Sequence, residues 1–283
     1  MIHIGSLSSS YKLILAVGTT TRPKYRSLLL GLLRPFVRDG EFSIRYRCYE
    51  GFNRSYLRIS DLAADVLSTR ELCVSDAYRL EREFRPEQVV DGGGNIGLFT
   101  LRAAAAYGRD ARYVICEPVP RNLAQIEKHL QLNGVRADIV SACLGGSRRT
   151  IPFYCRGANE GSFDPSLPYD SVLNIPVVLL EDVVEPSAER ILIKLDIEGM
   201  EMETLAAYLP TEKRPVYVVG ELHDRPKNAP VLERMFRDEG WTLELFDVDE
   251  VTCSFRGCSP SAVPLLSWAM ALDRPVSHEG ALR

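Results

Sequence analysis

Short apolar runs alternate along the chain with segments that have the hydrophobic spacing of helices. The apolar runs predict strands over Val89–Asp91, Tyr113–Glu117, Asp138–Cys143, Ile191–Leu195, Pro215–Gly220 and Trp241–Phe246. Helical patterns lie over Asn95–Tyr107, Arg121–Asn133, Met200–Tyr208 and Ala229–Asp238. Because strands that alternate with helices pair in parallel, this order predicts an α/β fold with a doubly wound, mostly parallel sheet and helices on both faces.

Three segments depart from this alternation. Glu41–Cys48 alternates like an edge strand, and Asp61–Leu80 predicts one or two helices over the binding side of the sheet. Residues 145–175 are rich in glycine and proline and predict a long loop with one short strand at Thr150–Cys155. Long loops in compact domains are often functional, so we expect either a lid over an acceptor or a plain surface insertion.

A glycine-rich turn follows the first strand of this series, over residues 91–97 (DGGGNIG). Gly92, Gly94 and Gly97 fit the dinucleotide pattern G-x-G-x-x-G. Asp91, which ends the strand, would repel a pyrophosphate at the helix N-terminus, where anions otherwise bind. A tight connection with Asp91 or Asn95 capping the helix is the alternative without a ligand.

The same turn also fits Asp-x-Gly-x-Asn-x-Gly, through Asp91, Gly93, Asn95 and Gly97. This is the pattern of S-adenosylmethionine-dependent methyltransferases, and an acid suits a cationic sulfonium ligand. Glu117 follows the next strand, about 20 residues beyond the last glycine, where an acid hydrogen-bonds a ribose in such folds. The turn and Glu117 together predict a ligand that carries adenosine.

Two more strands end in acidic residues. Asp196 and Glu198 follow Ile191–Leu195, and Glu221 and His223 follow Pro215–Gly220. Residues i and i+2 of an extended chain share a face, so each pair could point into one crevice. Open α/β sheets bind their ligands at the carboxyl ends of such strands.

These segments resemble the FkbM-type family of S-adenosylmethionine-dependent O-methyltransferases. The resemblance is carried by Val89–Thr100, Glu117-Pro118, Leu192–Leu205 and Glu221–Asp224, and it extends from about Arg45 to about Phe246. The block around DIEG at residues 196–199 is its specific part. The resemblance implies the class I methyltransferase fold, with a seven-stranded, mostly parallel sheet, and methylation of hydroxyl groups on natural products and glycans.

The resemblance also implies roles for individual residues. Asp91, Gly93, Asn95 and Gly97 would hold the methionine part of S-adenosylmethionine, and Glu117 the ribose. Asp196 and Glu198 would line the junction of cofactor and acceptor, with Glu221 and His223 beside them. The chain departs from the family at Gly92 and Gly94, where members usually carry a β-branched residue and an alanine.

Transfer to an alcohol is helped by a base, and two arrangements are consistent with the sequence. His223 is the first candidate for a catalytic base because its ordinary pKa is near neutrality, with Asp196 or Glu221 orienting it or replacing it. In the alternative, Asp196, Glu198, Glu221 and His223 bind Mg²⁺ or Mn²⁺, which acidifies the acceptor hydroxyl. The spacing does not require a metal.

Composition fits a globular enzyme without a nucleic-acid partner. The 283 residues carry a net charge of −4, so there is no broad basic surface for nucleic acid. The seven cysteines form no C-x-x-C pair, and reduced, buried thiols fit a cytoplasmic location. We expect one methyltransferase domain over residues 41–283.

Residues 1–40 predict a basic extension in front of that domain. Six basic residues precede the first acid, Asp39, and they are interleaved with leucines. An ordinary helix packed on the sheet or on a second subunit of a homo-oligomer is the simpler expectation; contact of residues 11–38 with an anionic membrane surface is the alternative.

The predicted function is therefore methyl transfer from S-adenosylmethionine to a hydroxyl of a sugar, glycan or other secondary metabolite. Two alternatives remain at this point. One is a nicotinamide-dependent oxidoreductase that uses the Gly92/Gly94/Gly97 turn, and the other is a non-catalytic adapter with a methyltransferase fold.

Overall fold

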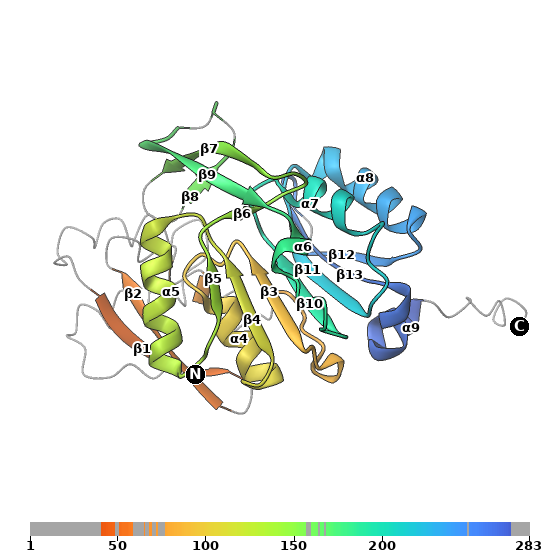
Figure 1. Cartoon of the computed structure of the whole chain (residues 1–283), viewed down its shortest axis with the longest axis horizontal. Coiled ribbons are helices and arrows are strands. Elements are labelled where there is room, and N and C mark those ends of the chain that lie inside the picture. Colours follow the sequence, from red (N-terminus) through yellow and green to blue (C-terminus); the bar gives the residue numbers. More distant parts are fainter. Residues whose placement is uncertain are drawn as a thin grey trace, which may run out of the picture.

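The computed structural model describes residues 41–48, 51–58, 65, 68–69, 72, 77–156, 160–163, 165–166, 168–247 and 249–272 (Figure 1). The basic extension over residues 1–40, its membrane alternative and most of the predicted helices over Asp61–Leu80 lie outside these residues. Within them, no helix has both the length and the apolar character needed to cross a bilayer.

The centre of the fold is a seven-stranded sheet in the order β12-β13-β11-β10-β3-β4-β5. Its strands are β3 (Gln88–Gly92), β4 (Arg112–Cys116), β5 (Asp138–Val140), β10 (Ile191–Leu195), β11 (Val216–Leu222), β12 (Thr242–Phe246) and β13 (Cys253–Cys258). The first five are parallel, and β13 runs antiparallel to both β11 and β12. The predicted doubly wound, mostly parallel sheet is confirmed.

Helices cover both faces of this sheet, as the alternation of apolar residues requires (Figure 1). The helices are α4 (Leu98–Tyr107), α5 (Pro120–Asn133), α6 (Leu180–Val183), α7 (Glu201–Tyr208), α8 (Arg225–Asp238) and α9 (Ser267–Leu272), with short 3-10 helices η3 (Arg82–Phe84) and η4 (Pro260–Leu265). In β10, Ile191 and Ile193 belong to the core beneath α7 and α8, whereas Leu192 belongs to the core beneath α4 and α5.

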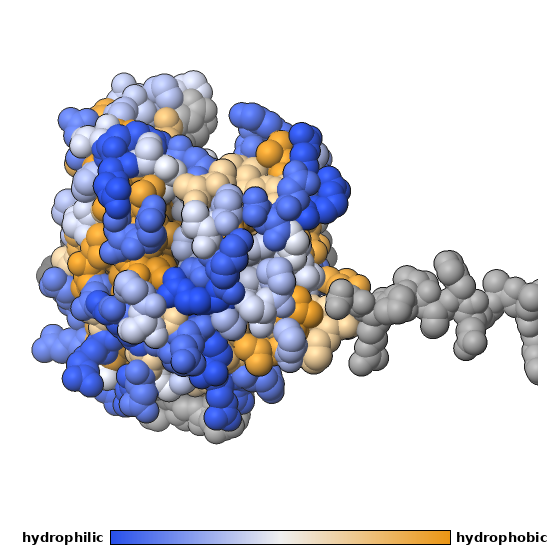
Figure 2. All heavy atoms as spheres, turned by 45° about the vertical axis from the view of Figure 1, so that its right-hand side comes forward, coloured by the Kyte–Doolittle hydropathy of each residue, from blue (hydrophilic) through white to orange (hydrophobic). Residues whose placement is uncertain are grey.

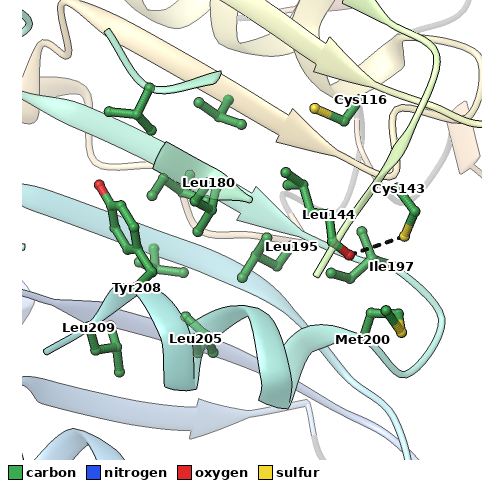
Figure 3. Close-up of a cluster of buried hydrophobic side chains, with 14 of the residues drawn as sticks. Cys116, Cys143, Leu144, Leu180, Leu195, Ile197, Met200, Leu205, Tyr208 and Leu209 are labelled. Carbon is green, nitrogen blue, oxygen red and sulfur yellow. Dashed lines mark hydrogen bonds between the residues drawn. The ribbon is translucent and has the colours of Figure 1, made fainter. Parts of the chain in front are cut away.

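Figure 3 shows the first of these cores, where α7 lies against β10. Leu195, Leu205 and Leu209 are fully buried there. Cys116 and Cys143 are buried in the same core as free thiols, and the Cys143 thiol donates to the Leu144 carbonyl at 3.2 Å. Burial raises the pKa of Cys116 to about 12, so the predicted reduced thiols are consistent with this environment.

The face of the molecule in Figure 2 is largely hydrophilic, with apolar residues in separate patches.

The prediction of a long loop over residues 145–175 is wrong, but the short strand predicted within it at Thr150–Cys155 is confirmed as part of a longer strand. Most of this segment forms a second sheet in the order β6-β9-β7-β8, with β6 (Cys143–Leu144), β7 (Arg149–Arg156), β8 (Glu160–Ser162) and β9 (Ser171–Val178). The predicted strand Asp138–Cys143 is therefore divided between the two sheets. Phe153, Ile175 and Val177 are buried against the α7 side of the core, and the intervening glycines and prolines hide this period-2 pattern in the sequence.

The predicted strand Glu41–Cys48 is present as β1, but it lies outside the central sheet. It pairs antiparallel with β2 (Gly51–Arg58) to form a separate hairpin. This hairpin packs on α5, where the His129 ring nitrogen Nε2 accepts a hydrogen bond from the Tyr56 amide at 2.8 Å.

Candidate active site

The glycine-rich turn connects β3 to α4 with three left-handed residues. Gly93 has a φ of 73°, Asn95 of 48° and Gly97 of 80°. Because this backbone cannot continue a helix, α4 begins at Leu98, and the prediction that it begins at Asn95 is wrong by three residues. The predicted capping by Asp91 or Asn95 is also wrong, since Gly97 precedes the helix and no side chain caps it.

Two of the glycines are required by close contacts. A Cβ atom on Gly93 would lie 1.8 Å from the carbonyl oxygen of Asp196, and one on Gly94 would lie 2.2 Å from Cγ2 of Ile115. At Gly94, the side chain of Ile115 already fills the space that a Cβ atom would need. The turn is thus held against β10 on one side and β4 on the other.

Lys194 supports the turn from inside the protein, although no motif in the sequence marks it as a functional residue. Its ammonium is buried and donates hydrogen bonds to the carbonyl oxygens of Gly92 at 3.0 Å and Gly93 at 2.6 Å. It also lies 3.4 Å from Asp91 Oδ1 and 3.7 Å from Asp196 Oδ2. Burial alone would lower the pKa of Lys194, but Asp91 and Asp196 outweigh it and raise the pKa.

Asp91 is fully buried behind the turn. Its Oδ2 accepts a hydrogen bond from the Thr100 hydroxyl at 2.8 Å, which joins the end of β3 to the first turn of α4. Together with Lys194, these contacts make Asp91 part of the support of the turn in this structure.

Glu117 also contacts the turn from behind. Its Oε2 accepts a hydrogen bond from the Asn95 amide at 2.8 Å, and its Oε1 accepts from the Val119 amide at 3.0 Å and from Asn122 Nδ2 at 3.2 Å. Burial raises the pKa of Glu117 and these hydrogen bonds oppose that rise. Glu117 thus bridges the ends of two adjacent strands, which is the position expected of a ribose-binding acid.

A cavity of about 320 Å³ opens in front of the turn, at the carboxyl ends of the parallel strands. Its lining comprises the backbone of the turn together with side chains from distant parts of the chain: Tyr78, Gly93, Gly94, Asn95, Phe99, Lys194, Asp196, Glu221, Asp247, Thr252 and others. The volume falls at the lower end of the range of small-molecule sites. The predicted residues Gly93, Asn95, Asp196 and Glu221 meet here, whereas Asp91, Gly97 and Glu117 are not among the lining residues.

Asp196 is held at the rim of this cavity by a tyrosine that the sequence pattern did not indicate. The Tyr78 hydroxyl donates to Asp196 Oδ2 at 3.0 Å. Burial, and then the negative charge of Asp196, raises the pKa of Tyr78, so the phenol stays protonated and remains a donor. Burial and the charge of Asp196 also raise the pKa of Glu221 on the neighbouring strand.

His223 lies between two acids beside the cavity. Its Nδ1 is 2.9 Å from Glu201 Oε1, and its Nε2 is 3.6 Å from Glu198 Oε2. Glu201 is fully buried and also accepts hydrogen bonds from the amides of Ile197 at 3.0 Å and Gly199 at 3.2 Å. The turn after β10 and the histidine after β11 are therefore joined through Glu201, another residue that the sequence analysis missed.

Charge in this group favours a protonated histidine. Burial alone would lower the pKa of His223, but the hydrogen bond to Glu201 and the charges of Glu201, Glu198 and Asp196 raise it to about 10. Burial and the charge of Asp196 raise the pKa of Glu198 to about 7. His223 therefore does not have the near-neutral pKa for which it was the first candidate for the catalytic base.

The structure brings three of the four predicted metal donors together. Asp196, Glu198 and His223 each offer a ligand atom, and these atoms all lie within 4.8 Å of one another. Glu221 is outside this group. Asp196 and Glu198 are close together as predicted, but the predicted reason is wrong. Glu198 has a left-handed φ of 57°, so the two residues lie in a turn and not in an extended i, i+2 pair.

The strand order, the glycine turn and the cavity at the strand ends define a class I methyltransferase fold. The model of the family described as "Methyltransferase FkbM domain" matches residues 91–245, which is more than half of the chain. The protein belongs to this methyltransferase family, and the resemblance in the sequence is confirmed. A search of the curated proteins gives no match.

Solved structures with a similar fold are distant in sequence. Methyltransferase FkbM from Methylobacillus flagellatus has 15% identity and a TM-score of 0.43, over 70% of this chain and 54% of that one. The M. jannaschii TYW2 structure with AdoMet has 11% identity and a TM-score of 0.41, over 78% and 87% of the two chains. The T. Thermophilus 16S rRNA methyltransferase RsmC, with AdoMet and guanosine, has 12% identity and a TM-score of 0.42, over 79% and 51%.

Proposed function

We propose that this protein is an S-adenosylmethionine-dependent O-methyltransferase that methylates a hydroxyl of a sugar, glycan or other secondary metabolite. The observation that carries the proposal is the cavity in which the backbone of Gly93, Gly94 and Asn95 faces the carboxylates of Asp196 and Glu221. Membership of the FkbM methyltransferase family supports the reaction class.

The cavity fits a cationic ligand that carries adenosine better than it fits a pyrophosphate. Its glycine backbone permits the close approach that an adenosine-bearing ligand needs, because no Cβ projects from Gly93 or Gly94. The acids Asp196, Glu221 and Asp247 line it, and they favour a positive charge and disfavour a dinucleotide phosphate. This electrostatic pattern supports S-adenosylmethionine over a nicotinamide dinucleotide.

In this proposal the predicted cofactor residues fall into two groups. Gly93, Asn95 and Asp196 contact the cofactor, whereas Asp91 acts through Thr100 and Lys194, which fix the turn. Glu117 lies directly behind the Asn95 amide. Its hydrogen bond holds the Asn95 backbone at the wall of the cavity, so Glu117 supports the cofactor site from behind.

The remaining groups orient the acceptor. When bound, S-adenosylmethionine supplies an already activated methyl group, so the protein mainly has to align a hydroxyl oxygen, and alignment of this kind contributes roughly 7–11 kcal/mol. Glu221 lines the cavity with a raised pKa, so it is a stronger base than a solvated carboxylate and accepts the hydroxyl proton. His223 contacts Glu198 and is joined to the Asp196 turn through Glu201, so it helps to orient both acids.

The charge around the cavity supports a neutral acceptor. Asp196, Glu198, Glu221 and Asp247 are concentrated at or beside its rim, and Lys194 is buried under the turn. A polyanion such as RNA would meet like charge on approach, which lowers association rates. A hydroxyl on an uncharged sugar, glycan or other secondary metabolite would not meet this repulsion.

The test is methyl transfer from S-adenosylmethionine labelled with ¹³C in the methyl group. The purified protein is incubated with uncharged glycans and hydroxylated metabolites, and with tRNA as a polyanionic comparison. We expect an O-methyl carbon signal with an uncharged acceptor and a Glu221→Gln variant at least tenfold slower in kcat. The surface variant Glu233→Gln on α8 serves as the matched control. Methylation of nitrogen or of tRNA alone would contradict the proposal.

A further inference from the structure

The turn after β10 and the end of β11 place three metal-ligating side chains around one point at the rim of the cavity. We propose that Asp196, Glu198 and His223 form a binding site for a hard divalent cation, Mg²⁺ or Mn²⁺. The binding itself is independent of the proposed methyl transfer, whereas the role of the ion in acceptor activation rests on that proposed function.

The spacing of the donors suits one octahedral ion. Ligand atoms at about 2.1 Å from Mg²⁺ are about 3 Å apart when they are adjacent in the octahedron. His223 Nε2 and Glu198 Oε2 are 3.6 Å apart, and all three ligand atoms lie within 4.8 Å. Glu198 is the outermost donor, with 47% of its side chain exposed, so it is free to close the remaining distance.

The orientation of His223 is that of a metal ligand. Metal-binding histidines usually direct their second ring nitrogen to a carboxylate, which fixes the ring and the tautomer. Here Nδ1 is held by Glu201 at 2.9 Å, which leaves Nε2 directed toward Glu198. Glu201 is in turn fixed by the amides of Ile197 and Gly199, on the turn that carries the two acidic donors. One buried carboxylate therefore aligns the histidine with the other two ligands.

The donor chemistry and the position select the kind of cation. Two carboxylates and one imidazole suit Mg²⁺ or Mn²⁺ better than a soft metal, which prefers thiolates. Asp196 also lines the cavity, so an ion here would face the place where the acceptor hydroxyl meets the cofactor. A divalent ion at that point polarises a hydroxyl and makes its proton easier to remove.

The test is a titration of the full chain with Mn²⁺ alone. Binding is measured as the loss of the electron paramagnetic resonance signal of free Mn²⁺. We expect about one bound Mn²⁺ per chain, displaced by excess Mg²⁺. Glu198→Gln and His223→Gln should each weaken Mn²⁺ binding at least tenfold. The surface variant Glu233→Gln should leave the affinity unchanged, and Glu221→Gln should change it less than threefold, because Glu221 lies outside the group.

Two outcomes would overturn the site. One is the absence of Mn²⁺ binding by the wild-type protein, which would leave His223 as the partner of Glu198 and Glu201 in ion pairs only. The other is binding that survives both Glu198→Gln and His223→Gln. Because Mn²⁺ is titrated without cofactor or acceptor, failure of the metal site is distinguishable from failure of the methyltransferase proposal: a chain without Mn²⁺ binding that still transfers methyl groups would contradict only the metal.

Discussion

Charged side chains are arranged differently at the two ends of the parallel strands in the central sheet. We call the end where these strands begin the amino edge, and the end where they finish the carboxyl edge. At the amino edge, before β11, Glu212 accepts hydrogen bonds from Arg214 and from the Tyr208 hydroxyl, and its pKa falls to about 2 although burial alone would raise it. At the carboxyl edge, burial and then the charge of Asp196 raise the pKa values of Glu198 and Glu221. Each charge has a close partner at the amino edge, whereas at the carboxyl edge the acids outnumber the cations Lys194 and His223.

The backbone also differs between the two edges. Four of the six left-handed non-glycine residues in the described part of the chain follow strands at the carboxyl edge, namely Asn95, Glu198, Asp224 and Asp247, whereas Arg85 precedes β3 at the amino edge. Left-handed non-glycine residues cost free energy and persist where the surroundings enforce them. The carboxyl edge is therefore built at a local cost in stability, as expected of a binding site.

The largest expected effect is at the glycine turn. Gly93→Ala places a Cβ atom 1.8 Å from the Asp196 carbonyl at a left-handed position, so the turn must move. We expect a loss of at least ~3 kcal/mol in the free energy of unfolding, together with loss of cofactor binding. Urea unfolding measures the first and calorimetry the second.

The matched control for this variant is Gly134→Ala after α5. Gly134 is also left-handed, with a φ of 61°, but no atom lies within 4 Å of an added Cβ. Its cost should be only about 1 kcal/mol, from the backbone conformation alone. Equal costs for the two variants would show that the contact with Asp196 does not constrain the turn.

The next effect concerns the buried ammonium beneath the turn. Lys194→Met removes the partner of Asp91 and of two carbonyl oxygens, and leaves a buried carboxylate without a cation. Breaking a buried pair in this way costs about 3–5 kcal/mol, measured by urea unfolding. Lys213→Met, on an exposed lysine, should change stability by less than about 0.5 kcal/mol. A small effect at Lys194 would mean that the carboxyl edge does not depend on it.

The amino edge is tested by the pH dependence of Glu212→Gln. The folded pKa of Glu212, about 2, is below the ordinary 4.5 of an unfolded chain, so its contribution is present above pH 4.5 and is lost as the pH falls through about 2. We expect the variant to be less stable than wild type by at most about 3 kcal/mol at pH 7, and by less than half of that at pH 3. A pH-independent difference would exclude ionisation as the cause.

The smallest effect is expected at the exposed pairs of the same edge. Arg190 Nη2 lies 3.2 Å from Glu87 Oε1, with about two fifths of each side chain exposed. Arg190→Ala should cost less than about 1 kcal/mol in thermal unfolding, and salt should remove most of that cost. A larger cost would mean that burial does not explain why Glu212 is expected to contribute more to stability than the exposed pairs around it.

The sequence predicted what depends on local pattern. Apolar runs mark six of the seven strands of the central sheet, and distance along the chain marks the glycine turn and the acids that follow β4, β10 and β11. The strand β13 was not predicted, because serine, arginine and glycine interrupt its apolar positions. Lys194 was visible as the one charge in an apolar strand, but its partners are on β3 and could not be assigned without the sheet order.

Contacts between distant segments could not be predicted. Tyr78 reaches Asp196 across 118 residues, and nothing in its surrounding sequence marks it. Glu201 resembles an ordinary acid in the first turn of a helix, although it anchors His223. The strand at Thr150–Cys155 was predicted, but the sheet that it forms with β6, β8 and β9 was not, because glycine and proline interrupt the apolar alternation around it.

The most direct test of the account is a calorimetric titration with S-adenosylmethionine, S-adenosylhomocysteine and NAD⁺. We expect the wild-type protein and Gly134→Ala to bind both sulfur compounds in the micromolar range, Gly93→Ala to bind neither, and NAD⁺ to produce no heat of binding. Binding of NAD⁺ without binding of the sulfur compounds would contradict it and would make the Gly92/Gly94/Gly97 turn a dinucleotide site.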